Sequence, residues 1–362
     1  MPENYELTAA PLPRIVAPDL PYRPPRPKFY RPRIGLIGCG GIADYHLQAA
    51  KAQEVEVAAF YNPSIEKARN RRDSYFPQGH VCASVEELLM YPGVEVVDIA
   101  THADVRGPLI EAALRAGKHV LSQKPFTLDL AEGRRLVLLA RDLGLCLAVN
   151  QNGRWAPYFS YLLQAASSGL LGEMQTLELT MNWDHTWIQG TAFEQMPHLL
   201  LQDFAIHWFD IAATVFADRA VGRICCNTMR LPGETISAPL AASAFVEFEG
   251  GLSTLAFNGY SKLGQREQFV AVGSRGTLRG AGPLCGIRSL ALFTSQGEAE
   301  IGLNGAWFPD GFTGALGELL CAIEEGREPS HSAANNLRSL EIVFAAMRSA
   351  AEPCPASPAT VR

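Results

Sequence analysis

Two residues four positions apart, Asp203 and His207, have the types and spacing of an acid–base pair. On a helix this spacing places both side chains on one face. A carboxylate beside an imidazole can orient the ring and raise its basicity, which gives a general base that works near neutral pH. The spacing alone equally suits a hydrogen-bonded pair within a helix. The apolar neighbours Phe204, Ile206 and Phe209 indicate that this face is not simply exposed to solvent.

A lysine followed by proline, Lys124-Pro125, comes directly after a short apolar run. Proline restricts the preceding residue to an extended backbone, and the bond between the two can be cis. The lysine is therefore held in a fixed direction at the end of a predicted strand. The alternative is a surface lysine in a turn, and its place at the mouth of the predicted sheet argues against that.

Residues 34–43 read Ile-Gly-Leu-Ile-Gly-Cys-Gly-Gly-Ile-Ala, an apolar run followed at once by a glycine-rich turn. A strand that turns tightly into a helix needs glycine for the turn. A second glycine lets the backbone approach a pyrophosphate, and a small third residue lets the helix pack on its strand. The pattern favours a dinucleotide site over a plain turn between strand and helix. The candidate cofactor contacts here are Gly38, Gly40, Gly41 and Ile42.

Further cofactor contacts are expected where other strands end, because a dinucleotide lies along the carboxyl ends of parallel strands. Asn62 follows the second strand, where an acidic residue would favour NAD. Its amide can bond the ribose without repelling a 2′-phosphate, so NAD and NADP both remain open, with NAD slightly favoured. Thr101 and His102 follow the fourth strand, and His102 is either a wall of the nicotinamide pocket or a polar loop residue. Gln123 and Lys124 follow the fifth.

The elements that position these residues alternate between strands and helices in the first half of the chain. Such alternation predicts βαβ units and a doubly wound parallel sheet. The later half reads as helices around short strands punctuated by glycine, which indicates a mainly antiparallel sheet. The predicted strands are 34–37, 55–60, 94–100, 119–121, 145–149 and 174–182, with further β-type runs between 221 and 295, and the predicted helices are 41–52, 64–74, 105–116, 129–143, 157–168, 198–216, 312–325 and 335–350.

The composition limits the classes of function. A chain of 362 residues is long enough for two domains with their own cores. A net charge of −6 offers no basic field to nucleic acid or an anionic membrane, and no apolar run is long enough to cross a bilayer. The eight cysteines form no Cys-x-x-Cys pair, which argues against a disulfide framework or a structural zinc site. We therefore expect a cytoplasmic protein without nucleic-acid, membrane or metal partners.

In this order the motifs resemble the glucose–fructose oxidoreductase / inositol dehydrogenase (Gfo/Idh/MocA) family, over roughly residues 33–350. The resemblance implies an N-terminal Rossmann domain and a C-terminal α/β domain with a large open, mainly antiparallel sheet. The motifs that carry it are Gly-Cys-Gly-Gly-Ile-Ala at 38–43, Ala-Gly-Lys-His-Val at 116–120, Gln-Lys-Pro at 123–125, Asn152 with Arg154 before Pro157, Gly-Leu-Leu-Gly-Glu at 169–173, and Asp203-x-x-x-His207.

The resemblance also implies an NAD- or NADP-dependent dehydrogenase that acts on a hydroxyl of a sugar, sugar derivative or cyclitol, as a homodimer or homotetramer. By the family's pattern Lys124, Asp203 and His207 form the catalytic set. His207 would take the hydroxyl proton, Asp203 would orient His207 or hold a neighbouring hydroxyl, and Lys124 would polarise the reacting oxygen. Two rivals are NAD-dependent glycoside cleavage by transient ring oxidation and a non-enzymatic dinucleotide-sensing regulator, although the regulator would be expected to lack the catalytic residues.

Three residues depart from the family's pattern. Gln123 stands where glutamate is usual, His102 where proline often follows threonine, and Asn62 where an acid is common. None of these removes the catalytic set, so the departures bear on which cofactor is preferred and how firmly it is retained.

Substrate contacts are expected between the strand at 174–182 and the catalytic helix. Aromatic faces stack on sugar rings, and imidazole and guanidinium groups bond hydroxyls, so Trp183, His185, Trp187 and Arg154 are candidates. The tryptophans are equally compatible with a core or a subunit contact. Three domains are therefore predicted: a proline-rich arm at 1–32, read also as a solvated tail, a dinucleotide-binding domain at 33–150 and a substrate-binding and oligomerisation domain at 151–362.

Overall fold

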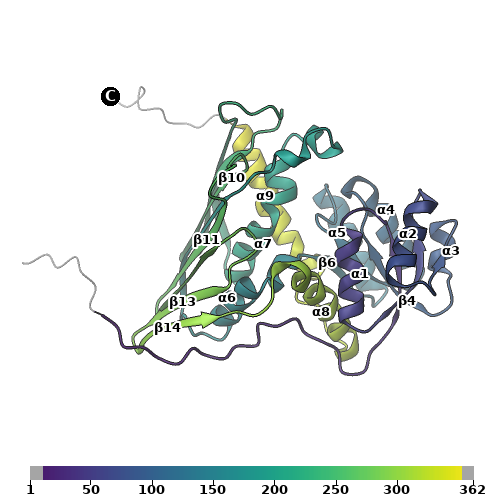
Figure 1. Cartoon of the computed structure of the whole chain (residues 1–362), viewed down its shortest axis with the longest axis horizontal. Helices are drawn as coiled ribbons and strands as arrows, with labels where there is room; N and C mark the ends of the chain where they lie inside the picture. The colour runs from purple at the N-terminus through teal and green to yellow at the C-terminus, as the bar shows by residue number, and fades with distance from the viewer. Residues whose placement is uncertain (1–10, 353–362) are drawn as a thin grey trace, which may run out of the picture.

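The computed structural model describes residues 11–352, which form two sheets with helices packed around them (Figure 1). The first sheet lies among the N-terminal helices, and the second, larger sheet lies at the other end of the molecule. The elements of the first half are β1 (Arg33–Ile37), α1 (Ala43–Ala52), β2 (Glu56–Tyr61), α2 (Ile65–Tyr75), β3 (His80–Val81), α3 (Val85–Leu89), β4 (Val94–Ile99), α4 (Arg106–Arg115), β5 (His119–Gln123), α5 (Leu130–Asp142) and β6 (Leu147–Asn150).

The first sheet has six parallel strands in the order β3-β2-β1-β4-β5-β6. Its central strands are buried along nearly their whole length, as expected where helices cover both faces. The predicted doubly wound parallel sheet is confirmed. The sequence reading missed β3 and α3, because strands and helices this short carry almost no periodicity.

The second sheet has eight strands in the order β14-β13-β12-β11-β7-β10-β9-β8. Only the β7–β10 pair among them is parallel, so the prediction of a mainly antiparallel sheet is confirmed. The elements of the second half are α6 (Pro157–Ser167), β7 (Met174–Asn182), α7 (Ile206–Val215), β8 (Val221–Met229), β9 (Ala241–Phe248), β10 (Gly251–Asn258), β11 (Arg266–Gly273), β12 (Gly276–Gly282), β13 (Ser289–Thr294), β14 (Gly297–Gly302), α8 (Phe312–Glu325) and α9 (Ala333–Ala351).

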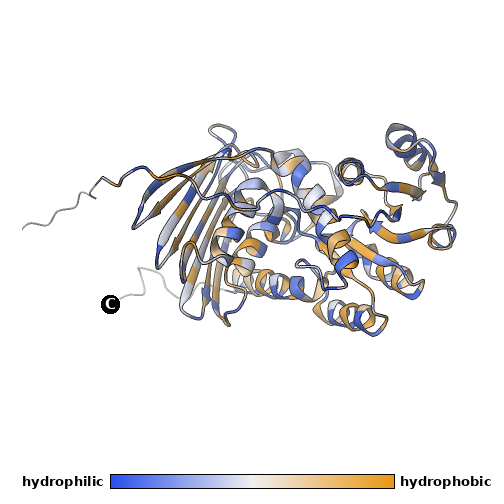
Figure 2. Ribbon diagram, turned by 90° about the horizontal axis from the view of Figure 1, so that it is seen from below, coloured by the Kyte–Doolittle hydropathy of each residue, from blue (hydrophilic) through white to orange (hydrophobic). Residues whose placement is uncertain are grey.

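Helices α6, α7 and α9 cover one face of the second sheet, and the other face carries no helix within residues 11–352 (Figure 1). Hydrophilic and hydrophobic residues alternate along its strands (Figure 2). In β7 the side chains of Leu177, Leu179 and Met181 point to the helices and are at most 1% exposed. Alternation of this kind is what one buried and one open face require.

Helix α8 returns the chain to the first domain. Phe312 and Leu316 of α8 share a hydrophobic cluster with Ala43 and Leu47 of α1. The two domains are thus held together by packing as well as by the connections at β6. Within the described residues, no helix combines the length and apolarity needed to span a lipid bilayer.

The long helix predicted at 198–216 is interrupted. A π-helical turn, η5 (Leu200–Phe204), precedes α7. In a π-helical turn each backbone hydrogen bond spans five residues, whereas in an α-helix it spans four. The directions of successive side chains therefore differ from those in a regular α-helix. Asp203 lies in the π-helical turn and His207 in α7, so the two residues do not belong to one regular α-helix.

Residues 11–32 run as an extended arm along both domains (Figure 1). At the edge of the second sheet Pro13 and Ile15 exchange backbone hydrogen bonds with Glu298 of β14, with lengths of 2.8 and 2.9 Å. At its other end, the Glu324 carboxylate of α8 accepts the backbone N–H groups of residues 28–30. This stretch of the predicted arm is therefore bound to its own chain, and residues 1–10 lie outside the described part.

Candidate active site

The glycine-rich turn between β1 and α1 has the form of an anion cradle. Gly38 has a φ of +99°, and a Cβ there would lie 2.8 Å from the Ala100 carbonyl, so only glycine fits. A Cβ on Gly40 or Gly41 would meet no atom within 4 Å. Within residues 11–352 the amides of Gly40, Gly41 and Ile42 donate to no acceptor. Open space and free amides at a helix N-terminus fit the pyrophosphate of a dinucleotide.

Asn62, at the end of β2, is bound to this turn. Its Oδ1 accepts the amide of Cys39 at 3.0 Å, and its Nδ2 donates to the Ser64 carbonyl at 3.1 Å. The guanidinium of Arg71 from α2 lies beside the same turn and donates to the Gly40 carbonyl at 3.0 Å. The ribose end of the predicted cofactor site thus has an amide and a nearby guanidinium where many Rossmann folds have a carboxylate.

Lys124 and Asp203 form an ion pair that joins the two domains. Lys124 follows β5, and its Nζ donates to Asp203 Oδ1 at 2.9 Å and to the Asp203 backbone carbonyl. The lysine backbone amide donates to Gln123 Oε1 at 2.7 Å, and the Lys124–Pro125 bond is cis. The two charged side chains remain 12% and 23% exposed. Both keep bonding capacity that another molecule can use.

His207 lies near this pair without being bonded to Asp203. Its half-buried ring meets the edge of Trp307 at a centroid distance of 5.3 Å, and its Nδ1 is buried without a hydrogen-bond partner among the described residues. Burial lowers the pKa of His207 well below its usual range, and the Lys124 ammonium lowers it further. The imidazole is therefore neutral near pH 7 and able to accept a proton. Asp203 is bonded to Lys124, so the structure does not bear out its expected role of orienting His207.

Arg106, which the sequence reading missed, ties together two of the loops that build the site. Its Nε donates to the Thr101 carbonyl at 3.0 Å, and its Nη1 donates to the Pro125 carbonyl. The residue is 4% exposed, and burial lowers the pKa of its guanidinium to about 10. A buried arginine that donates to carbonyls fixes the loops after β4 and β5 relative to each other. An arginine in the first turn of a helix, where acidic residues are favoured, was the available signal.

The tryptophans after β7 differ in their exposure. Trp183 is 2% exposed and stacks on Phe204 at a centroid distance of 4.0 Å, with its indole N–H donating to His185 Nδ1. Its faces are covered, so the expectation that it stacks on a sugar is wrong. Trp187 is 61% exposed and meets the edge of His185 at 5.3 Å, which leaves it available to a ligand.

A contact between aromatic rings joins the loop after β4 to the segment after β7. Phe193, in the segment after β7, lies 5.7 Å from the ring of His102, which follows β4 in the first domain. Phe193 also contacts Trp187 at 6.0 Å. His102 therefore lies at the boundary between the two domains.

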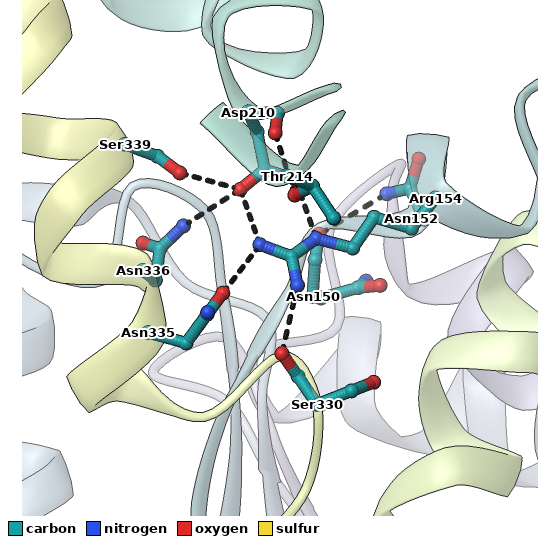
Figure 3. Close-up of polar contacts among 9 residues, drawn as sticks. All are labelled: Asn150, Asn152, Arg154, Asp210, Thr214, Ser330, Asn335, Asn336 and Ser339. Carbon is teal, nitrogen blue, oxygen red and sulfur yellow. Dashed lines mark hydrogen bonds and ion pairs between the residues drawn. The ribbon is translucent and has the colours of Figure 1, made fainter. Parts of the chain in front are cut away.

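Arg154 lies in a buried polar network rather than at an open pocket (Figure 3). Its Nε and Nη2 each bond the Asp210 carboxylate of α7 at 2.7 Å. Nη1 donates to the Ser330 carbonyl at 2.8 Å, and Nη2 also donates to Asn335 at 2.7 Å. The two charged side chains are 5% and 1% exposed. The predicted substrate role is corrected here, because the chain itself satisfies the guanidinium.

A second cluster of polar groups lies at the edge of the first sheet. His80, Cys82 and Glu87 bring three potential ligand atoms within 4.8 Å of one another. The Glu87 carboxylate is already engaged, since one oxygen bonds His80 at 2.7 Å and the other accepts the Ala83 amide at 2.6 Å. Glu87 therefore acts as a first-turn residue of α3 that bonds back to residues before the helix, whose N-cap is Ser84.

Comparisons with known proteins agree with this fold. Residues 32–151 match the model of the oxidoreductase family with an NAD-binding Rossmann fold, and residues 159–279 match that of the GFO/IDH/MocA C-terminal domain. D-apiose dehydrogenase from Paraburkholderia graminis is 28% identical over 67% of this chain and 66% of its own length, so the chain spans about two thirds of that relative. Inositol 2-dehydrogenase from Rhizobium meliloti is 24% identical over 88% of this chain and 97% of its own.

A solved structure of an oxidoreductase from Agrobacterium radiobacter, in complex with NAD+, L-tartaric acid and magnesium, has the same fold. It is 23% identical, with a TM-score of 0.79 over 89% of this chain and 97% of that one. The parallel sheet with its glycine turn defines an NAD-binding Rossmann protein with a second α/β domain. The chain belongs to the Gfo/Idh/MocA family of oxidoreductases.

Proposed function

We propose that the protein is an NAD(P)-dependent dehydrogenase that transfers hydride between the nicotinamide and a secondary hydroxyl of a sugar, sugar derivative or cyclitol. The observation that carries the proposal is the meeting of Lys124 with Asp203 and His207. These residues come from two domains, and they converge at the carboxyl ends of the strands whose first turn forms the anion cradle. The names of the relatives, which act on apiose and inositol, support a polyhydroxylated substrate.

Each residue of this set has a separate task. The bound nicotinamide supplies the hydride acceptor, and the protein handles the proton. Neutral His207 accepts the proton of the reacting hydroxyl, which its lowered pKa permits near neutral pH. Lys124 donates to the reacting oxygen as negative charge develops on it. Asp203 holds the ammonium in place through Oδ1, and its other carboxylate oxygen remains able to bond a neighbouring hydroxyl.

The choice of cofactor follows from the ribose end of the site. Asn62 places no negative charge there, and Arg71 places a guanidinium beside the same turn. A 2′-phosphate is therefore not repelled, and we propose that both NAD and NADP bind. We further propose that copies of the chain associate into a homodimer or homotetramer through the open face of the eight-stranded sheet.

The test is hydride transfer by the purified protein, followed as NADH or NADPH absorbance with a panel of sugars and cyclitols. Lys124→Ala and His207→Ala should each lower kcat by about 100- to 10,000-fold, while the Kd for NADH changes little. Lys28→Ala, which removes an exposed lysine of the arm, is the matched control and should behave as the unaltered protein. Full activity in both site variants would show that the residues are misassigned.

Two other outcomes would replace the proposal. Release of an aglycone from a glycoside without net NADH would identify a glycoside-cleaving enzyme that oxidises the ring only transiently. Absence of any turnover, together with a stable protein partner, would identify a dinucleotide-sensing regulator.

A further inference from the structure

The segment after β7 holds an imidazole in one place. The His185 amide donates to the Gly259 carbonyl at 2.8 Å, and the Trp183 amide donates to the Asn258 carbonyl at 2.9 Å. These bonds fix the segment to the end of β10. Trp183 is fixed further by its stack on Phe204, the residue that follows Asp203. The position of the His185 ring is therefore set by the sheet and by the same segment that carries the catalytic carboxylate.

The hydrogen bond from Trp183 decides which nitrogen of His185 carries a proton. The indole Nε1 lies 3.0 Å from His185 Nδ1, and an indole N–H is only a donor. Nδ1 must therefore be the unprotonated acceptor, and a neutral imidazole then has its proton on Nε2. This assignment follows from the chemistry of the indole, whereas most histidine tautomers have to be chosen from ambiguous partners.

The Nε2–H of His185 has no acceptor within the described residues. The atom is buried, and the whole residue is only 2% exposed. A buried donor without an acceptor costs free energy, so such a group points to an acceptor that arrives with a ligand. The ring centroid of Phe204 lies 5.0 Å from that of His185, and the charges of Asp203 and Lys124 both act on the pKa of His185. The His185 ring therefore lies against the segment that carries Asp203.

We propose that the Nε2–H of His185 donates a hydrogen bond to an oxygen of the bound substrate, and that Trp183 is a positioning residue that holds His185 in this tautomer. The inference rests on the proposed function and assigns a specific group within that site. It replaces the stacking role expected for Trp183 by an indirect one.

The protonation state of His185 suits this role. The pKa of His185 is lowered to about 4, chiefly by burial; the Asp203 and Asp184 carboxylates oppose this effect, and the Lys124 ammonium adds to it. The bond from Trp183 also disfavours a second proton, because Nδ1–H and the indole N–H would then face each other. Above about pH 5 the ring therefore remains a neutral Nε2–H donor.

Steady-state kinetics of two His185 variants test the donor directly. His185→Ala should raise KM for the substrate about 10- to 100-fold, while the Kd for NADH, measured by fluorescence, stays unchanged. His185→Gln should recover most of the loss, because its side-chain amide nitrogen can take the place of Nε2 and donate. A loss of stability alone would move the thermal midpoint in both variants and would not distinguish glutamine from alanine.

Trp183→Phe tests the tautomer, because it keeps the ring on Phe204 and removes only the indole N–H. We expect KM to rise severalfold, and we expect the variant with both Trp183→Phe and His185→Ala to be no worse than His185→Ala alone. Tyr260→Phe is the matched control, since it removes the hydrogen bond to the Gly233 carbonyl in a neighbouring loop and should leave KM unchanged.

The outcomes separate this inference from the function on which it rests. If the unaltered protein oxidises no sugar or cyclitol, the proposed function fails, and the inference fails with it. If the unaltered protein is active and His185→Ala has an unchanged KM, or if alanine and glutamine behave alike, the inference alone is overturned.

Discussion

Two ion pairs connect the loops after strands of the first sheet to the segment around α7, and they differ in almost every respect. Arg154 and Asp210 are 5% and 1% exposed and are surrounded by polar groups of the same chain (Figure 3). Lys124 and Asp203 are 12% and 23% exposed and make fewer contacts. In the inner pair, Arg154–Asp210, the hydrogen-bonding groups of both side chains are satisfied. In the outer pair, Lys124–Asp203, some of these groups remain free to bond another molecule.

Under the proposed function, one pair anchors α7 and the other takes part in the chemistry. Asp210 accepts from Arg154, Asn336 and Ser339 together, so α7 is fixed against the loop after β6 and against α9. Asp203 lies seven residues earlier on the same segment. A firmly held inner pair therefore sets the position of the outer pair, whose charges remain accessible.

Breaking the inner pair should have the largest effect. Asp210→Asn leaves the Arg154 guanidinium buried without its charge partner, and this should lower the free energy of unfolding by about 3–5 kcal/mol. Urea denaturation followed by circular dichroism measures the loss. A variant with full stability would mean that the polar neighbours satisfy the guanidinium without the carboxylate.

Breaking the outer pair should affect turnover instead of stability. Asp203→Asn keeps the shape of the side chain but removes the charge that holds Lys124, so kcat should fall about 100- to 1,000-fold. The unfolding midpoint should change little because the pair is partly exposed. If Asp203→Asn destabilised the protein as much as Asp210→Asn, the division between anchoring and chemistry would be wrong.

A third carboxylate, that of Glu267, extends the comparison because it is buried without a cationic partner among the described residues. Glu267 accepts from Tyr158 Oη at 2.7 Å, Trp208 Nε1 at 2.9 Å and the Cys285 amide at 2.9 Å. Burial raises the pKa of Glu267 from its ordinary value of 4.5 to about 7, against the lowering effect of these hydrogen bonds. The folded protein thus retains a proton that the unfolded chain has already released.

The stability of the protein should therefore fall as the pH rises from 4.5 to 7. In that window the unfolded state binds fewer protons at this site than the folded state, and the total loss is about 3 kcal/mol. Glu267→Gln should remove this part of the pH dependence, which denaturant titrations at pH 5 and pH 8 would measure. Parallel pH dependences in the two proteins would show that Glu267 is ionised throughout.

The smallest expected effect concerns cofactor choice at Asn62. Asn62→Asp places a carboxylate at the ribose end of the site, where it should repel a 2′-phosphate. The ratio of kcat/KM for NAD to that for NADP should rise roughly tenfold, which corresponds to about 1.4 kcal/mol. A falling ratio would indicate that the lost bond from Nδ2 to the Ser64 carbonyl outweighs the repulsion.

The sequence sufficed for the parts of the molecule in which neighbours along the chain determine geometry. The turn at 38–43 and the lysine after β5 belong to this class, because glycine, proline and strand ends act locally. It did not suffice for Trp183 and Trp187, which are four residues apart and are 2% and 61% exposed. Which of them is covered depends on Phe204, a residue from another segment.

Arg154 was misassigned for the same physical reason. Its partners Asp210, Ser330 and Asn335 lie 56 to 181 residues away in the chain, so the network cannot be seen from its neighbours. The π-helical turn before α7 was likewise missed, because the residue pattern predicted one continuous helix at 198–216.

The arm at 11–32 has a consequence for how substrate reaches the site. The arm is hydrogen-bonded to Glu298 on the larger sheet and to Glu324 on α8, so it links the two domains at two fixed points. Separating the two domains would therefore break the hydrogen bonds of the arm to at least one of these two residues. Under the proposed function, substrate and product are therefore expected to pass by rearrangement of the segment that carries Phe193, while the two domains keep their mutual orientation.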